Sequence, residues 1–357
     1  MNIVLSGYYG FDNVGDEAIL FAIIRALREW DPAVEITVLS NNPAYTAETY
    51  GVNAVNRWKP GEVRAALKQS DGLISGGGSL LQDKTGPKSI PYYLGVIKLA
   101  QWMKKPVFVY AQGMGPVSGK ANRLLMKKVL QKAELLTVRD SQSKQLLEDI
   151  GITRSITVVP DPVMGLNPGD FQSNWLEKDP GIQTIAVSVR DWTENLDYLN
   201  DIAASLDELA ERGNRIVFVP MHGEHDLKTS ERTAAMMQQE ALIAPHDSSI
   251  EEKMAIISEV DLLIGMRLHA LIFAAAGSTP FLALSYDPKI DSFASITGQR
   301  VIGSVSPQDW NHKDLTAAAE RILKNYAIEA EKLNEKALPL QKQAAGTANL
   351  VLDALRK

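Results

Sequence analysis

An arginine and a histidine two residues apart lie where the sequence predicts that a strand turns into a helix. The apolar run 260–264 is followed by Gly265, and Arg267 and His269 precede the helix-forming segment 270–276. Exposed backbone N–H groups and the helix dipole favour a phosphate or carboxylate at such a turn, and a guanidinium adds a bidentate donor. His269 adds a proton carrier. The alternative is structural: Arg267 pairs with a carboxylate, and His269 bonds a backbone carbonyl.

Two further cations follow apolar runs in the same half of the chain. Arg190 comes directly after the run 185–189, and Lys289 follows the run 280–285 through a Tyr-Asp-Pro segment. In a doubly wound sheet the first strand of a half is central. We therefore expect Arg190 to lie close to Arg267 and to share an anion with it. Lys289 would be the third cation of that rim, with a solvated position as its alternative.

Glycine-rich loops follow three predicted strands of the N-terminal half, at residues 6–17, 76–83 and 112–116. Glycines let the backbone approach a ligand closely. The first loop does not match the GxGxxG pattern, and Ser-Asn-Asn at 40–42 lacks the acidic residue that a dinucleotide ribose requires, which argues against a dehydrogenase. The polar side chains of this loop suit sugar hydroxyls or general-base chemistry, and helix capping is the alternative for Asp16.

Two polar side chains near these loops have structural interpretations. Ser79 follows three glycines and is placed to cap the next turn. Arg139 ends the apolar run 135–138 and would project at the strand end. An internal ion pair of Arg139 with Asp140 or Asp161 is the favoured interpretation.

Composition narrows the class of protein. The chain has 357 residues, 45% of them hydrophobic, which favours two domains over one or three. A net charge of −6 argues against nucleic-acid binding. The chain has no cysteine, and its five histidines show no HExxH spacing, so we expect no metal. The start of the sequence lacks signal-peptide features and no apolar stretch is long enough to span a membrane, so we expect a cytoplasmic location.

Short apolar runs alternate with helical patterns, which is typical of a parallel sheet covered by helices on both faces. The predicted strands fall in two series, near residues 2–6, 35–39, 72–75, 106–111, 135–138 and 156–159, and then 184–189, 215–220, 241–244, 260–264, 280–285 and 300–303. In the second series we expect helices near 195–212, 228–240, 249–258, 267–276 and 290–297.

The segment 165–181 is rich in turn-forming residues and reads as an interdomain linker. We expect an N-terminal Rossmann-like domain over 1–165, a second over 182–312, and closing helices over 313–357 with a break at Gly346. Two such halves describe a GT-B-like α/β arrangement, in which two doubly wound domains face an interdomain cleft. The carboxyl ends of the strands would carry the chemistry.

A basic helix is predicted at residues 119–133. Its cations, Lys120, Arg123, Lys127, Lys128 and Lys132, fall within one half of the helix circumference, and Leu125, Met126, Val129 and Leu130 fill the other half. Such a face suits anionic lipid headgroups at the inner surface of the cell membrane. An ordinary solvated face is the alternative.

Five segments together resemble the polysaccharide pyruvyl transferases, in particular the bacterial CsaB type. They are residues 7–17, 76–83, 112–116, 266–269 and 286–289, and the likeness runs from residue 3 to about 290 in the order of the family. The resemblance implies a GT-B-like fold, phosphoenolpyruvate as donor and no cofactor. For the CsaB type it implies that an N-acetylmannosamine residue on a polyprenyl-diphosphate-linked disaccharide receives a ketal-linked pyruvate. The product of that type anchors surface-layer proteins to a secondary cell-wall polymer.

The resemblance also assigns roles to residues. It implies that His269 is catalytic, with Asp16 as a further catalytic residue in the opposite domain. The N-terminal domain would bind the acceptor and the C-terminal domain the donor. We expect donor contacts from Arg267, Leu268, Arg190, Lys289 and Arg139. We expect acceptor contacts from Gly10, Asp12, Asn13, Gly77, Gly78, Ser79 and Gln112.

The chemistry of ketal formation explains these residue types. Phosphoenolpyruvate carries a carboxylate and a phosphate, so its site needs several cations. A proton must reach the methylene carbon while sugar hydroxyls attack the central carbon, and an imidazole with an ordinary pKa near about 6.5 can carry protons in either direction. A GT-B glycosyltransferase that uses a nucleotide sugar is the alternative enzyme. A non-enzymatic sensor of sugar phosphates is the third interpretation.

Overall fold

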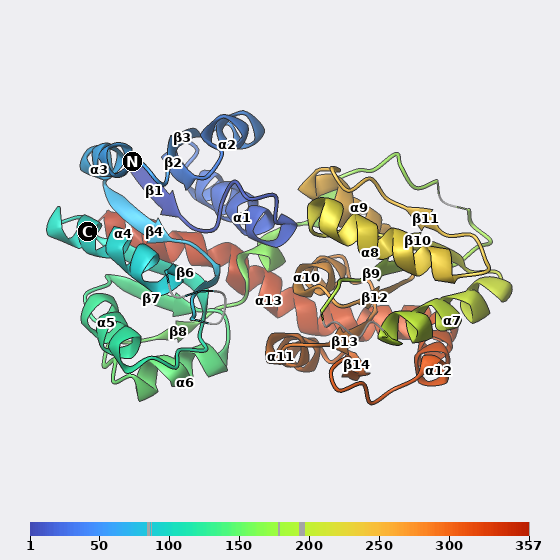
Figure 1. Cartoon of the computed structure of the whole chain (residues 1–357). Coiled ribbons are helices and arrows are strands. Elements are labelled where there is room, and N and C mark those ends of the chain that lie inside the picture. Colours follow the sequence, from blue (N-terminus) through green and yellow to red (C-terminus); the bar gives the residue numbers. More distant parts are fainter. Residues whose placement is uncertain (84–85, 87, 178, 193–196, 357) are drawn as a thin grey trace. The chain divides into compact units, whose positions relative to one another are not determined.

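The computed structural model describes residues 1–83, 86, 88–177, 179–192 and 197–356. The chain divides into two compact units (Figure 1). The first unit contains Met1–Gly165 and Leu340–Lys357, and the second contains Leu166–Pro339. The predicted boundary after residue 165 thus coincides with the observed one, whereas the predicted C-terminal segment 313–357 is shared between the two units.

A parallel sheet forms the centre of the first unit. Its strand order is β3-β2-β1-β4-β6-β7-β8, and β5 pairs with β6 off this path. The strands are β1 (Asn2–Ser6), β2 (Glu35–Ser40), β3 (Asn53–Asn56), β4 (Gly72–Ser75), β5 (Gly78–Leu81), β6 (Val107–Met114), β7 (Leu135–Val138) and β8 (Thr157–Val158). The helices are α1 (Val14–Trp30), α2 (Pro43–Tyr50), α3 (Pro60–Gln69), α4 (Ser89–Trp102), α5 (Lys120–Leu130) and α6 (Ser141–Asp149).

The second unit is built around a parallel sheet with the order β11-β10-β9-β12-β13-β14. Its strands are β9 (Thr184–Ser188), β10 (Arg215–Phe218), β11 (Leu242–Ile243), β12 (Leu262–Gly265), β13 (Phe281–Ser285) and β14 (Arg300–Ser304). Its helices are α7 (Asp197–Glu211), α8 (Gly223–Met236), α9 (Ile250–Glu259), α10 (Leu268–Ala276), α11 (Pro288–Thr297) and α12 (His312–Lys324). The long helix α13 (Tyr326–Leu355) belongs to both units.

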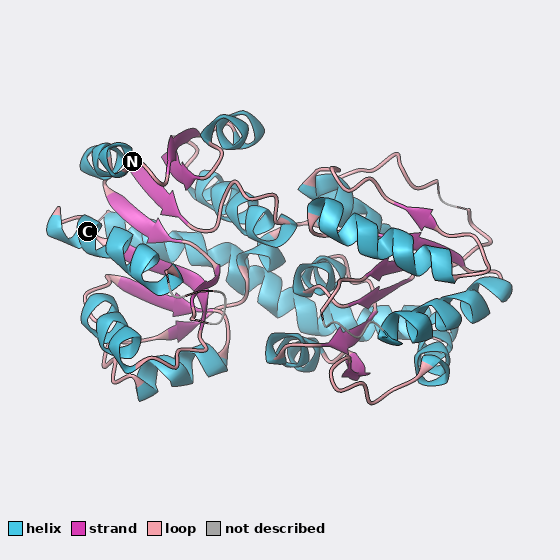
Figure 2. Cartoon of the chain, in the orientation of Figure 1, coloured by secondary structure: helices cyan, strands magenta, loops and turns pink. Residues whose placement is uncertain are grey.

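The central strands are buried along their whole length, which explains the continuous apolar runs in the sequence. Every residue of β4, β9, β12 and β13 is buried. A strand buried on both faces needs helices on both sides, as a parallel sheet with crossover helices provides. In Figure 2 helices flank the magenta strands of each unit. The predicted GT-B-like α/β class, with two doubly wound sheets, is confirmed.

Three local predictions were wrong. The glycine-rich residues 78–81 form the short strand β5, so Ser79 does not cap a turn. Strand β3 was missed because its sequence, Asn-Ala-Val-Asn, is partly exposed and has little apolar character. Helix α13 continues through Gly346 and contains Pro339, where the chain passes from one unit to the other. The predicted start of a helix at 195 lies outside the described residues, which resume at Asp197.

The predicted linker 165–181 carries two single-turn segments, η1 (Pro162–Gly165) at its start and η2 (Pro168–Asp170) within it. Both contain a proline, which fixes the backbone of a turn. No helix in the described part of the chain has the length and apolar character required to cross a bilayer.

Candidate functional site

The topology of the second sheet brings the predicted donor-site residues to one edge. Strands β10, β9, β12 and β13 are neighbours in this order, and all of them are parallel. Their carboxyl ends therefore meet at the same edge of the sheet. Arg190 follows β9, His222 follows β10, Arg267 follows β12, and Lys289 follows β13. The sequence predicted that Arg190, Arg267 and Lys289 gather at this edge, whereas His222 was not among the predicted donor contacts.

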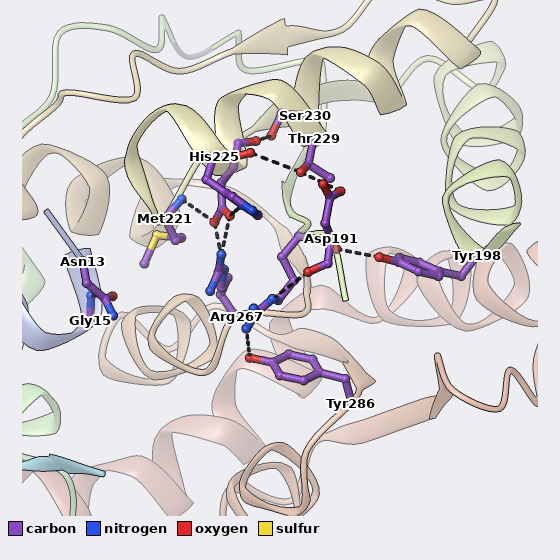
Figure 3. A network of polar contacts seen from close by, with 12 residues as sticks. Asn13, Gly15, Asp191, Tyr198, Met221, His225, Thr229, Ser230, Arg267 and Tyr286 are labelled. Atoms are coloured by element: carbon purple, nitrogen blue, oxygen red, sulfur yellow. Dashed lines mark hydrogen bonds and ion pairs between the residues drawn. The ribbon is translucent and has the colours of Figure 1, made fainter. Parts of the chain in front are cut away.

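Arg267 is held by a carboxylate that the sequence did not single out as its partner. Its Nε donates to Asp226 Oδ2 at 2.9 Å, and its Nη2 bonds Asp226 Oδ1 (Figure 3). Asp226 is completely buried in the first turn of α8 and also accepts a hydrogen bond from the Met221 backbone at 3.2 Å. Arg267 thus pairs with a carboxylate, as the structural alternative for this residue predicted. Among the described residues no partner is found for its third nitrogen, Nη1, which stays available for a ligand.

Arg190 is fixed by aromatic rings as well as by hydrogen bonds. Its Nη1 donates to the Tyr286 hydroxyl at 3.0 Å, and its Nε donates to the Asp191 carbonyl at 3.2 Å. The guanidinium carbon lies 5.0 Å from the centre of the Trp192 ring and 4.7 Å from that of Tyr286. Its backbone carbonyl accepts a hydrogen bond from Tyr198 at 2.7 Å. Such cation–π contacts leave the charge in place for an anion.

Helix α8 links these two arginines into one network (Figure 3). Besides Asp226, it provides Thr229, whose hydroxyl donates to Asp191 Oδ1 at 2.9 Å. Burial lowers the pKa of His222, and the nearby charges of Arg267 and, less strongly, Arg190 lower it further. His222 is thus neutral at physiological pH, and the positive charge at this edge resides on the arginines.

His269 lies in the first turn of α10, two residues after Arg267. The imidazole is half-buried, whereas Leu268 beside it is 7% exposed. Arg267 occupies the N-cap position but makes no side-chain cap, so the first N–H groups of α10 are not satisfied by it. A helix start with uncapped N–H groups binds anions. This turn combines a proton carrier, backbone donors and a guanidinium.

Lys289 is held less firmly at this edge than the two arginines are. Its Nζ lies 3.6 Å from Asp287 Oδ2, and the side chain is 34% exposed. Asp287 caps α11, and with Asp291 and Asp309 it lines a pocket of about 420 Å³ at the carboxyl ends of β13 and β14. Three carboxylates in one pocket repel a dianion. The favourable place for an anion is therefore beside Arg190 and Arg267, and not in this pocket.

The only candidate cluster of metal ligands among the described residues lies next to Arg267. Ligand atoms of His222, His225 and Asp226 come within 4.8 Å of one another. The Asp226 carboxylate already accepts two hydrogen bonds from Arg267, so a metal cation here would have to displace a guanidinium. These three side chains are better explained as residues that hold Arg267 in place.

In the first unit, the loop after β1 is organised by a buried glutamate that sequence reasoning missed. Glu17 Oε1 accepts the Gly10 backbone N–H at 2.7 Å, and Oε2 accepts the Tyr50 hydroxyl at 2.8 Å. Burial raises the pKa of Glu17, although these hydrogen bonds oppose the rise. An acidic residue within an apolar stretch of helix, as at 17–24, was the available signal. Gly10 thus has a structural role in shaping the loop.

The same loop brings Asp16 next to the glycines that precede β5. Asn13 caps α1, so the alternative interpretation of Asp16 as the cap of this helix is wrong. Asn13 Nδ2 donates to Asp16 Oδ2 at 2.8 Å. Gly78 has a φ of +81°, and a Cβ atom there would lie 2.7 Å from Asp16 Oδ1. The structure therefore groups Asp16, Asn13 and Gly78, while Asp12 is exposed with a φ of +56°.

Four other predicted site residues are engaged or buried inside the first unit. Arg139 Nη2 donates to Ser79 Oγ at 2.9 Å, and Nη1 lies 3.5 Å from Asp161 Oδ2, which is the internal pair favoured from the sequence. Its side chain is 9% exposed. Gln112 is completely buried, with its amide nitrogen 3.5 Å from the Gly76 carbonyl. Gly77 is buried as well. These contacts stabilise the loops and leave Asp12, Asn13 and Asp16 as the more accessible polar groups.

Replacing Asp226 tests the support of Arg267. In Asp226→Asn the guanidinium loses its counter-charge in a largely buried position, so we expect the free energy of unfolding to fall by about 3 kcal/mol. The pKa of His222 should fall further, because the carboxylate that raises it is gone while Arg267 remains. Urea unfolding and NMR titration of the imidazole measure both effects. Asp287→Asn, at a more exposed ion pair, is the control, and equal stability of the two variants would contradict the prediction.

Comparison with known proteins connects this site to a family. The sequence profile of the polysaccharide pyruvyl transferases matches residues 13–288. The amylovoran biosynthesis protein AmsJ of Erwinia amylovora is 25% identical over 247 residues, which are 62% of this chain and 58% of AmsJ. The chain thus matches less than two thirds of the length of that relative.

Solved structures share the fold at low sequence identity. HepE of Anabaena, in complex with UDP-glucose, has a TM-score of 0.65 at 9% identity, over 100% of this chain and 99% of HepE. A UDP-GlcNAc 2-epimerase from Neisseria meningitidis bound to UDP-GlcNAc has a TM-score of 0.68 at 10% identity, over the full length of both chains. A glycosyltransferase from Rickettsia africae gives 0.67 at 12%, over 99% and 97%. The profile match covers most of the sequence, and we conclude that this chain belongs to the polysaccharide pyruvyl transferase family.

Proposed function

We propose that this protein transfers pyruvate from phosphoenolpyruvate to two hydroxyls of an N-acetylmannosamine residue on a polyprenyl-diphosphate-linked glycan precursor, forming a ketal. One observation carries the proposal. Two fixed arginines, Arg190 and Arg267, follow adjacent central strands beside the uncapped start of α10, which also carries His269. Membership of the family supports transfer of pyruvate to a polysaccharide. The CsaB-type acceptor, and the use of the product in anchoring surface-layer proteins, are proposed from the resemblance of the sequence to that type.

The donor matches the charges at this edge. Phosphoenolpyruvate carries a phosphate and a carboxylate, and Arg267 Nη1 and the Arg190 guanidinium provide separate cationic donors for them. The backbone N–H group of Leu268 adds a donor at the start of α10. Lys289 would complete the charge from the edge of the site. Because its guanidinium is engaged by Ser79 and Asp161, we assign Arg139 to loop structure and not to the donor.

The proton transfers that the reaction requires define the role of His269. One sugar hydroxyl attacks the central carbon of phosphoenolpyruvate and loses its proton to a base, while the methylene carbon gains a proton from an acid and becomes a methyl group. The second hydroxyl then forms the other C–O bond as phosphate leaves, and its proton goes to the phosphate or to a base. We assign His269 the delivery of the first proton and Asp16 the orientation or deprotonation of an acceptor hydroxyl. The reaction exchanges no electrons, so it needs no redox cofactor.

Turnover of His269→Gln tests this assignment. Loss of a general acid costs about 10²–10⁴-fold in rate, so we expect kcat to fall by that factor while phosphoenolpyruvate still binds. Release of phosphate and the appearance of the ketal carbon in a ¹³C NMR spectrum measure the reaction. His246→Gln, at a half-buried histidine elsewhere in the second unit, is the control. A kcat for His269→Gln within a factor of two of the wild type would refute the role of His269.

A nucleotide-sugar glycosyltransferase is the second candidate function. It is favoured by the similar folds of proteins solved with UDP-glucose and UDP-GlcNAc. The charges argue against it, because the two arginines and the helix start suit a compact dianion.

We also propose that helix α5 rests on an anionic membrane surface, where a lipid-linked acceptor would reside. Two apolar side chains of this helix are exposed beside the lysines: Leu124 is 54% exposed and Leu125 is 38% exposed. The same helix exposes three lysines, Lys120, Lys127 and Lys128. Arg123, in contrast, donates a hydrogen bond to the Val117 carbonyl. Exposed leucines among lysines match an interfacial helix.

Vesicle binding tests this surface. Each lysine near an anionic membrane contributes about 1 kcal/mol, so Lys127→Glu with Lys128→Glu should abolish binding to vesicles containing phosphatidylglycerol at low salt. Lys68→Glu, at an exposed lysine of α3, is the control and should bind like the wild type. Sedimentation with vesicles measures the bound fraction. Absence of wild-type binding at low salt, or binding that the double variant retains, would contradict the proposal.

A further inference from the structure

A cluster of aromatic rings lies at the carboxyl ends of β1, β2 and β3, which are neighbours in the first sheet. Tyr8 and Phe11 belong to the loop after β1, Trp58 lies in the segment after β3, and Tyr92 belongs to α4. We call these four side chains the aromatic platform. Trp58 is 58% exposed and Tyr8 is 40% exposed, so the platform offers ring surface to solvent.

The buried Arg57 packs against the rings of the platform. The residue is 4% exposed, and its guanidinium carbon lies between 4.5 and 5.4 Å from the ring centres of Phe11, Trp58, Tyr92 and the adjacent Tyr93. Its Nη1 donates to the Gly7 carbonyl at 2.7 Å and its Nη2 to the Tyr93 hydroxyl at 3.2 Å. Within the described part of the chain no carboxylate pairs with it, and its buried Nε has no hydrogen-bond partner. A buried cation supported mainly by ring faces fixes those rings strongly.

Trp58 is held rigidly although most of it is exposed. Its indole N–H donates to Asn41 Oδ1 at 2.9 Å, and its backbone N–H donates to Asn56 Oδ1 at 2.9 Å. Asn41 in turn donates from Nδ2 to the Gly10 carbonyl at 3.3 Å. The exposed ring is thus connected to the loop that carries the proposed acceptor contacts. A surface ring already fixed in one orientation loses little entropy when a ligand packs on it.

Tyr8 and Phe11 extend the platform toward Asp16. Their rings are stacked, with centres 4.0 Å apart and planes 5° apart. Burial raises the pKa of Tyr8, and the charge of Asp16 adds to the rise. Asn13, bonded to Asp16, adds an amide. Flat apolar faces therefore adjoin amide and carboxylate groups.

This combination fits a sugar ring. The face of a pyranose presents C–H bonds, which pack on the electron-rich face of an aromatic ring, while its hydroxyls bond amides and carboxylates at the edge. We propose that the aromatic platform binds a pyranose of the acceptor glycan, with Trp58 as the main stacking surface. The inference rests on the proposed function for the identity of the glycan, and it goes beyond that function in assigning specificity to aromatic side chains, with Trp58 and Tyr92 lying outside the glycine loops.

The probe is a soluble disaccharide diphosphate with a short alkyl chain and a terminal N-acetylmannosamine. Its binding is measured by isothermal titration without phosphoenolpyruvate. We expect Trp58→Ala to weaken binding about tenfold and Trp58→Phe to restore most of it, because a ring is kept. In the transfer assay the KM for the disaccharide should rise by a similar factor, with the KM for phosphoenolpyruvate unchanged. Trp102→Ala, at a 72% exposed tryptophan of α4, is the control.

The outcomes separate the two proposals. Transfer that proceeds with an unchanged disaccharide KM in Trp58→Ala overturns the platform and leaves pyruvyl transfer standing. Disaccharide binding that depends on Trp58 without any transfer supports the platform and contradicts the proposed function. Equal weakening by Trp58→Ala and Trp102→Ala, or no wild-type binding, also overturns the platform. Matching thermal unfolding of the variants establishes that each is folded.

Discussion

The ion pair between Arg267 and Asp226 is the interaction on which the second unit's candidate site depends. It joins the start of α10 to the first turn of α8, and these elements follow β12 and β10 on either side of β9. Breaking such a pair leaves one buried charge uncompensated, which is strongly destabilising. The pair therefore fixes the guanidinium in one orientation. That orientation leaves one nitrogen for a ligand and keeps positive charge where a dianion would bind.

The first unit uses a buried carboxylate in a similar way. Glu17 accepts hydrogen bonds from Gly10 and Tyr50, and so shapes the loop after β1 without meeting a cation. In both units a parallel sheet gathers the loops, and a buried acid then fixes one of them. The polar groups assigned to donor and acceptor are thus preorganised by residues that need not touch either substrate.

The fold and the loops that bear the site could be predicted because parallel strands leave continuous apolar runs, each ending in glycine or a polar residue. The interaction partners of the site residues could not be predicted. Asp226 lies 41 residues from Arg267 in sequence and reads as one of several polar residues in its loop. Arg57 carries no motif, and only the pairing of neighbouring strands brings aromatic rings around it. The break expected at Gly346 is absent, and α13 also contains Pro339, a residue type that disfavours helix interiors, at the point where the chain passes between the units.

Isothermal titration of the purified protein with phosphoenolpyruvate tests the central claim most directly, with UDP-GlcNAc as competing ligand and Arg190→Gln as the variant. This substitution removes a cation and keeps the Arg267–Asp226 pair intact. We expect phosphoenolpyruvate to bind the wild type, to bind the variant at least tenfold more weakly, and not to be displaced by UDP-GlcNAc. Binding of UDP-GlcNAc alone would contradict a phosphoenolpyruvate site at this edge and favour the glycosyltransferase.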